Sequence, residues 1–125
     1  MTTVKIRVGS AEQARSELGR ALKALEHGRA VRAQREIWFS TLGQAAAVLT
    51  EERLELLRTL RRQRPATPAD LARVVERPLR TVRRDLIALA EVGLVRFKAG
   101  DQEQRPVATC DRIQIDGILA IARAA

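Results

Sequence analysis

Five side chains between residues 80 and 87 are spaced so that they share one face of a helix. They are Arg80, Thr81, Arg83, Arg84 and Ile87, left facing solvent once Val82, Leu86 and Leu89, at i, i+4 and i+7, are assigned to a buried stripe. Arginine binds phosphate, or guanine O6 and N7, through two parallel hydrogen bonds, and threonine reaches a base edge or a phosphate. This face therefore predicts a helix that enters the major groove of double-stranded DNA.

Basic residues also flank this helix. Arg77 precedes it, and Arg96 and Lys98 lie on an alternating segment after it, residues 94–98. A polar turn at 100–104 follows, and Arg105 directly precedes a second alternating segment, residues 106–109. We expect these four to contact the DNA backbone, with plain solvation as the alternative. Further possible backbone contacts are Arg61, Arg62, Arg64 and Thr67, although basic residues at a helix end also suit the helix dipole.

Helix start and stop signals place the elements that position these residues. Thr50, followed by two glutamates, predicts the start of one helix, and Thr67 with Pro68 and Asp70 predicts the start of a second. A third helix is expected from about Leu79 to Val92, where Gly93 supplies a left-handed stop. Leu54, Leu57 and Leu60 are expected to form the buried stripe of the first helix. Three helices and a two-stranded hairpin over residues 50–109 follow from these signals.

Composition narrows the functional classes. The chain has 125 residues with 23 basic and 15 acidic side chains, a net charge of +8, which fits a nucleic-acid partner but also fits a general preference for arginine. One histidine, His27, and one cysteine, Cys110, provide neither a zinc site nor an internal disulfide. Cys110 is expected to be an inert buried thiol, with redox sensing as the alternative. With no signal sequence and no apolar stretch that could span a membrane, we expect a cytoplasmic protein without metal or cofactor.

The first 49 residues carry apolar patterns without a comparable signal for DNA. Val4, Ile6 and Val8 alternate as a strand, Ser10 and Gln13 predict the start of a helix that ends near Gly28, and residues 35–40, including Trp38, predict a second strand. We expect residues 1–49 to form a strand-helix-strand-helix extension that holds a homodimer, with help from the C-terminal segment. Residues 110–125 are expected to add a strand and a short final helix at 117–125.

Residues 50–109 resemble the MarR-type winged helix-turn-helix transcription regulators. The shared pattern, T-V-x-R-x-L-x-x-L-x-x-x-G-L-V, is carried by Thr81, Val82, Arg84, Leu86, Leu89, Gly93, Leu94 and Val95. Nearly the whole chain resembles a compact group of predicted prokaryotic regulators, some of which act as antitoxins. The resemblance implies a mainly α fold with a small β part (α+β), a winged helix-turn-helix with an N-terminal dimerisation extension. Pro78 departs from the pattern, because such families often have serine or threonine as the cap at this position.

The function expected from these observations is sequence-specific binding of double-stranded DNA by a transcription regulator that represses its own promoter. The alternative is an antitoxin that binds a small toxin protein as well as its promoter. An enzyme is disfavoured, because the chain has no catalytic Ser/His/Asp or Cys/His set and no glycine-rich phosphate loop. Scattered acidic residues, Asp101, Glu103, Asp111 and Asp116, are read as solvated side chains in preference to a magnesium site. An RNA-binding protein is disfavoured by the scarcity of aromatic residues, and a module that binds only proteins would not need three arginines on one helix face.

Overall fold

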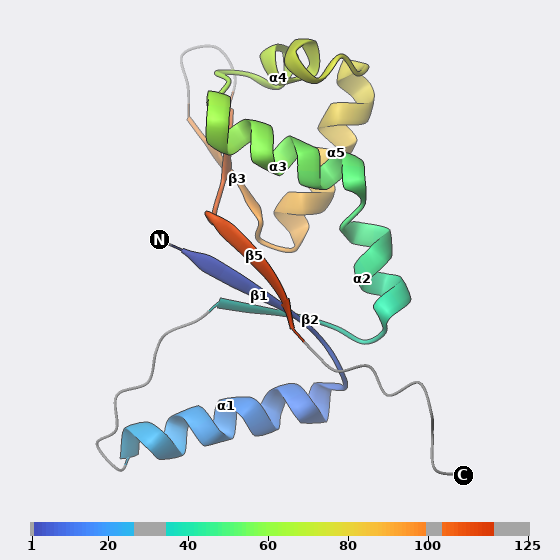
Figure 1. The fold of residues 1–125 in the computed structure, drawn as a ribbon. Helices are drawn as coiled ribbons and strands as arrows, with labels where there is room; N and C mark the ends of the chain where they lie inside the picture. Colours follow the sequence, from blue (N-terminus) through green and yellow to red (C-terminus); the bar gives the residue numbers. More distant parts are fainter. Residues whose placement is uncertain (1, 27–34, 100–103, 117–125) are drawn as a thin grey trace. The chain divides into compact units, whose positions relative to one another are not determined.

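The computed structural model describes residues 2–26, 35–99 and 104–116, and it has a mixed α/β fold (Figure 1). Contacts divide the chain into two compact units. The helical unit comprises residues 1–2 and 46–111, and the sheet unit comprises residues 3–45 and 112–125, so the boundary falls within helix α2, Leu42–Val48. The predictions for His27 and Gly28, for the tip of the turn at 100–103 and for a final helix at 117–125 concern residues outside those described.

The sheet unit is built on three parallel strands in the order β2-β1-β5. The central strand β1, Thr3–Val8, pairs Val4 and Ile6 with Arg35 and Ile37 of β2, Arg35–Phe39, on one side. On its other side the same two residues pair with Ile113 and Ile115 of β5, Arg112–Asp116. The sequence pattern predicted a C-terminal segment, residues 110–125, separate from residues 1–49, whereas β5 of this segment is an integral strand of the N-terminal sheet. Alternation of apolar residues revealed each strand but could not reveal its partner.

Helix α1, Ala11–Glu26, begins with the predicted capping box. The backbone N–H of Gln13 donates to Ser10 Oγ at 3.1 Å, and the Gln13 side chain accepts the Ser10 N–H at 2.7 Å. None of the α1 side chains whose surroundings are described is buried, and Leu18 is 61% exposed. The amphipathic pattern therefore predicted the helix correctly, but Leu18 on its apolar face remains open to solvent.

Three helices form the body of the helical unit: α3, Glu51–Gln63, α4, Pro68–Val75, and α5, Leu79–Glu91. The predicted caps are confirmed, since Thr50 Oγ1 accepts the Arg53 N–H at 3.3 Å and Thr67 Oγ1 accepts the Asp70 N–H at 3.1 Å. In α3 the expected stripe was partly wrong. Leu56 is fully buried together with Leu57 and Leu60, whereas Leu54 is only half-buried, because α3 packs against neighbours on more than one side.

A hairpin follows α5. Gly93 adopts the predicted left-handed conformation (φ 84°), and the Leu94 N–H donates to the Leu89 carbonyl at 2.9 Å, which ends the helix. Strand β3, Val95–Lys98, then pairs antiparallel with β4, Arg105–Ala108. Strand β3 packs beside α5 and β4 packs beside α3. The hairpin therefore lies between these two helices.

Candidate nucleic-acid interface

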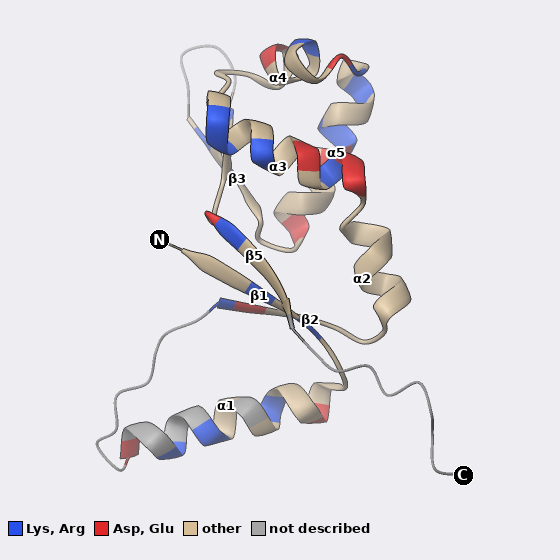
Figure 2. Cartoon of the chain, viewed as in Figure 1, with Lys and Arg blue, Asp and Glu red and all other residues tan. Residues whose placement is uncertain are grey.

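The outer face of α5 carries the five residues singled out in the sequence. Arg80, Arg83, Arg84 and Ile87 are exposed and Thr81 is half-buried, whereas Val82, Leu86 and Leu89 on the opposite face are at most 1% exposed. The predicted orientation of the helix is thus confirmed. Figure 2 shows the basic residues of α5 gathered in its first half. This face offers guanidinium groups and one large aliphatic side chain to a partner.

The start of α5 has no side-chain cap. Pro78 occupies the N-cap position with φ −58° and makes no capping hydrogen bond, as its lack of a side-chain oxygen predicted. Its carbonyl accepts the Val82 N–H at 3.0 Å, so the first helical turn is nonetheless regular. Arg80, the second residue of α5, therefore lies in a regular first turn that has no side-chain cap.

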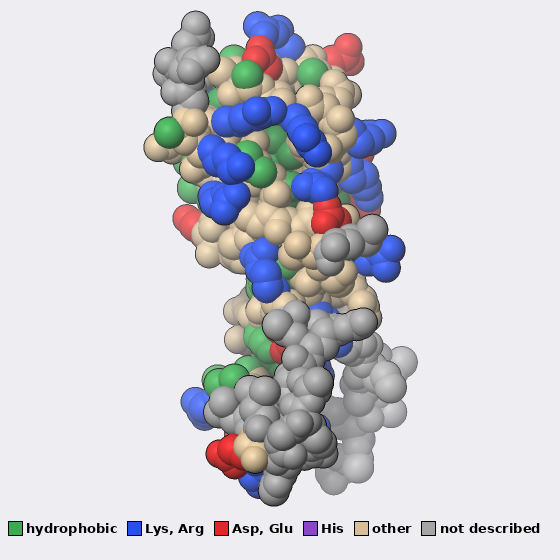
Figure 3. Space-filling view, turned by 90° about the vertical axis from the view of Figure 1, so that its left-hand side faces the viewer, with side chains coloured by type: hydrophobic (Ala, Val, Ile, Leu, Met, Phe, Trp, Pro, Cys, Tyr) green, Lys and Arg blue, Asp and Glu red, His purple; other side chains and the backbone are tan. Residues whose placement is uncertain are grey.

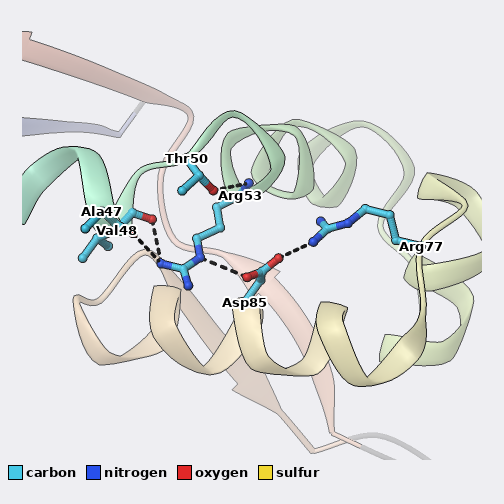
Figure 4. A network of polar contacts seen from close by, with 6 residues as sticks. All are labelled: Ala47, Val48, Thr50, Arg53, Arg77 and Asp85. Carbon is cyan, nitrogen blue, oxygen red and sulfur yellow. Dashed lines mark hydrogen bonds and ion pairs between the residues drawn. The ribbon is translucent and has the colours of Figure 1, made fainter.

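Asp85 lies on the inner side of α5 and joins two arginines from other parts of the helical unit (Figure 4). Its side chain is 9% exposed. Arg53 of α3 donates from Nε to Asp85 Oδ1 at 3.0 Å, and Arg77 donates from Nη2 to Asp85 Oδ2 at 2.5 Å. Arg53 Nη1 also donates to the carbonyls of Ala47 and Val48, at 3.2 and 3.0 Å, which ties the end of α2 to the same network. We refer to Arg53, Arg77 and Asp85 as the Asp85 network.

The Asp85 carboxyl is ionised in this setting. Burial alone would raise its pKa, but hydrogen bonds and charge attraction from Arg77 and Arg53 outweigh burial and hold the pKa below its ordinary value. Both carboxylate oxygens are therefore committed to partners within the helical unit. Asp85 therefore does not lie among the exposed arginines of the outer face of α5.

Arg77 consequently differs from its predicted role. It was expected at the DNA backbone, but its side chain is 22% exposed and its guanidinium is held by Asp85. Its Nη1 is buried and has no hydrogen-bond partner among the described residues. A signal for this pairing was present in the sequence, because Asp85 falls three residues after Val82 and four before Leu89, within the buried stripe of α5. A carboxylate at such a position requires a cationic partner.

The hairpin presents its predicted basic residues unequally. Arg96 and Lys98 are exposed, whereas Arg105 is half-buried and donates from Nη2 to the Arg64 carbonyl at 2.5 Å. Asp101 and Glu103, expected at the tip, lie outside the described residues. Arg96 and Lys98 are thus the hairpin side chains best placed to reach a partner.

Residues at the end of α3 and the start of α4 have partners within the helical unit. Arg61 forms an ion pair with Asp111, and Arg62 forms one with Glu55 at 3.3 Å. Arg64 is the C-cap of α3 and Thr67 is the N-cap of α4. Figure 2 shows the acidic residues of α3 near its start and the basic residues toward its end, an arrangement that favours the helix dipole.

The described residues contain no cluster of three or more histidine, cysteine or acidic side chains that could hold a metal ion. Cys110 is buried and forms no disulfide. Among the helices described, none is long and apolar enough to cross a membrane.

Comparison with known families gives one match. Residues 48–115, more than half of the chain, match the HVO_A0114 family over a segment that runs from the end of α2 into β5. A search of curated proteins gives no match. The chain is a member of the HVO_A0114 family.

Proposed function

We propose that residues 50–109 form a winged helix-turn-helix of the MarR type, in which α4 and α5 are the helix-turn-helix and the β3–β4 hairpin is the wing. On this proposal α5 enters the major groove, and the protein is a sequence-specific DNA-binding regulator that represses its own promoter. The order of three helices followed by a hairpin supports the fold, and the exposed basic face of α5 supports the function.

The observation that carries the proposal is the asymmetry of charge around α5. Arg80, Arg83 and Arg84 all lie on the exposed face. The single acidic residue in the first three turns of α5, Asp85, faces inward and is neutralised by Arg53 and Arg77. A solvated helix surface usually mixes charges in i, i+4 pairs. A helix face with three exposed arginines is suited to the phosphates and guanines of a major groove.

The hairpin and neighbouring residues have a secondary part in this proposal. Arg96 contacts a phosphate beside the major groove, and because Arg77 is held by Asp85 we assign it to support α5. The antitoxin role remains a prediction, since no observation in the structure favours a toxin-binding surface.

A homodimer is the second part of the proposal. Leu18 of α1 and Ile115 of β5 are 61% and 70% exposed, and parallel sheets are normally covered on both faces. A second copy that covers these residues would also let the protein read two half-sites through a two-fold axis. Sedimentation that shows a monomer at micromolar concentration would overturn this part alone.

Fluorescence anisotropy tests DNA binding directly. The protein is titrated against its own upstream DNA and against a shuffled duplex of equal length, across a salt series. Specific binding at physiological salt supports the proposal, whereas equal and steeply salt-dependent binding to both duplexes contradicts it. Arg84→Ala should lose about 1–3 kcal/mol at the specific site.

A matched control is available on α3. Arg58 is an exposed arginine of α3, not of α5, and pairs with Glu55 at 3.1 Å. Arg58→Ala removes the same charge and should leave specific affinity nearly unchanged, while Arg96→Ala should weaken binding to both duplexes similarly. Unchanged specific binding by Arg84→Ala would show that α5 does not read the DNA in this orientation.

A further inference from the structure

A basic cavity lies on the helical unit between the end of α3 and strand β4. It encloses about 300 Å³ and is lined by Leu60, Arg61, Arg64, Lys98, Arg105, Pro106, Val107 and Ala108. Half of these residues are basic and the others are apolar. We refer to this cavity as the α3–β4 groove. Figure 3 shows lysine and arginine side chains gathered on one face of the helical unit.

The charges in the α3–β4 groove are only partly balanced. Lys98 and Arg105 are direct partners across the hairpin, and like charges at such positions repel each other. Arg61 is neutralised by Asp111, whereas the side chains of Arg64 and Lys98 form no ion pair within the described part of the chain. An anion in the groove would relieve this repulsion.

The backbone holds the basic side chains in place. Arg64 has the left-handed conformation (φ 48°), and its carbonyl accepts the hydrogen bond from Arg105. This bond fixes the guanidinium of Arg105 against the end of α3, and Leu60, Pro106 and Ala108 beneath are at most 5% exposed. Apolar walls lower the local dielectric constant and so strengthen attraction between these cations and an anion.

The groove is separate from the outer face of α5. Strand β3 packs beside α5 and β4 packs beside α3, so the hairpin lies between the proposed recognition helix and the groove. A duplex bound on the outer face of α5 can therefore leave the α3–β4 groove unoccupied.

We propose that the α3–β4 groove binds a small phosphorylated anion of the pyrophosphate type, independently of DNA. Arg64, Lys98 and Arg105 supply hydrogen-bond donors to its phosphate oxygens, and arginine is suited to bind such oxygens in pairs. This inference goes beyond the proposed function, because the groove would bind its ligand whether or not α5 reads DNA.

The test is calorimetric titration of the full-length protein with inorganic pyrophosphate at constant ionic strength. Lys98→Gln and Arg64→Gln should each weaken binding about tenfold or more, while Lys98→Arg retains most of the affinity. Arg58→Gln is the control, since Arg58 is an exposed arginine of α3 outside the groove. Urea unfolding of every variant checks that folding is intact.

Three outcomes would overturn the proposal: no saturable binding at millimolar pyrophosphate, equal weakening by Arg58→Gln, or no weakening by either groove variant. The titration is then repeated with saturating duplex. Unchanged pyrophosphate affinity is expected, whereas competition would reassign the groove to the DNA backbone. If the protein binds no duplex, the proposed regulator function fails, but the titration of the free protein still decides the groove.

Discussion

The two compact units of the chain differ in how completely each buries its apolar side chains. In the helical unit Leu56, Leu71, Val82, Leu89 and Leu94 are fully buried. In the sheet unit Val4 and Ile6 of the central strand are buried, but Leu18 and Ile115 are more than 60% exposed. The helical unit thus closes a core of its own, whereas Leu18 and Ile115 leave exposed apolar surface in the sheet unit.

The units also differ in how they use charge. The helical unit places one carboxylate, Asp85, inside and balances it with two arginines, so this acidic side chain does not lie among the exposed arginines of α5. In the sheet unit Arg7 lies 4.8 Å from the centre of the Trp38 ring and pairs with Glu36 at 3.4 Å. There the arginine is paired with an acidic side chain near the surface. We therefore propose DNA binding for the helical unit and self-association for the sheet unit.

The largest expected effect comes from breaking the Asp85 network. Asp85→Ala leaves Arg53 and Arg77 without their shared carboxylate, and removing one partner of a buried ion pair costs about 3–5 kcal/mol. Urea unfolding measures the change. Glu91→Ala, at an exposed position of the same helix, should change stability by less than about 0.5 kcal/mol. Equal losses in both variants would show that the network does not hold the helical unit together.

The same network predicts a pH dependence. The pKa of Asp85 is lowered in the folded protein. The contribution of its ionised carboxylate to the free energy of unfolding is therefore fully present above the ordinary carboxyl pKa of about 4, and this contribution is lost as pH falls through the lowered pKa. The stability difference between the native protein and Asp85→Asn should therefore be constant near neutral pH and shrink below about pH 4. Urea unfolding midpoints across this range check it. A difference that stays constant to low pH would contradict the assignment.

A smaller effect is expected from altering the sheet unit. Ile115→Asp places a charge where a second copy would bury an aliphatic side chain, and should weaken self-association about tenfold or more. Sedimentation measures the change, with Gln114→Asp, at the exposed neighbour on the opposite face of β5, as the control. Because Ile115 is exposed within one chain, the free energy of unfolding of the monomer should change little. Loss of folding by Ile115→Asp would instead indicate that β5 depends on this side chain.

Local signals in the sequence predicted most elements. Thr50, Thr67 and Gly93 act through contacts within five residues, so their roles could be inferred without knowledge of the fold. The pairing of β5 with β1 could not, because it joins residues more than 100 positions apart. Alternation indicates a strand, whereas its partner is decided by the packing of the whole unit.

The candidate site divides in the same way. The outward direction of Arg80, Arg83 and Arg84 followed from the helical period alone. The partners of Asp85 are Arg53 of α3 and Arg77 of the turn between α4 and α5, and only the folded chain brings them together. The α3–β4 groove was equally hidden, since Arg64 and Lys98 lie on separate elements and their sequence positions indicated only general basic character.

The smallest expected effect concerns a turn of the helical unit. Glu76 caps α4 in the left-handed conformation (φ 57°), with its N–H directed at the carbonyls of Ala72 and Arg73. This conformation costs a residue with a side chain about 1–2 kcal/mol, while glycine adopts it freely but gives up more chain entropy. Glu76→Gly should therefore stabilise the helical unit by about 0.5 kcal/mol. Thermal and urea unfolding measure the gain, and sedimentation should show unchanged self-association, because the sheet unit is untouched. A Glu76→Gly protein that is less stable would show that the Glu76 side chain contributes more to this turn than its backbone strain costs.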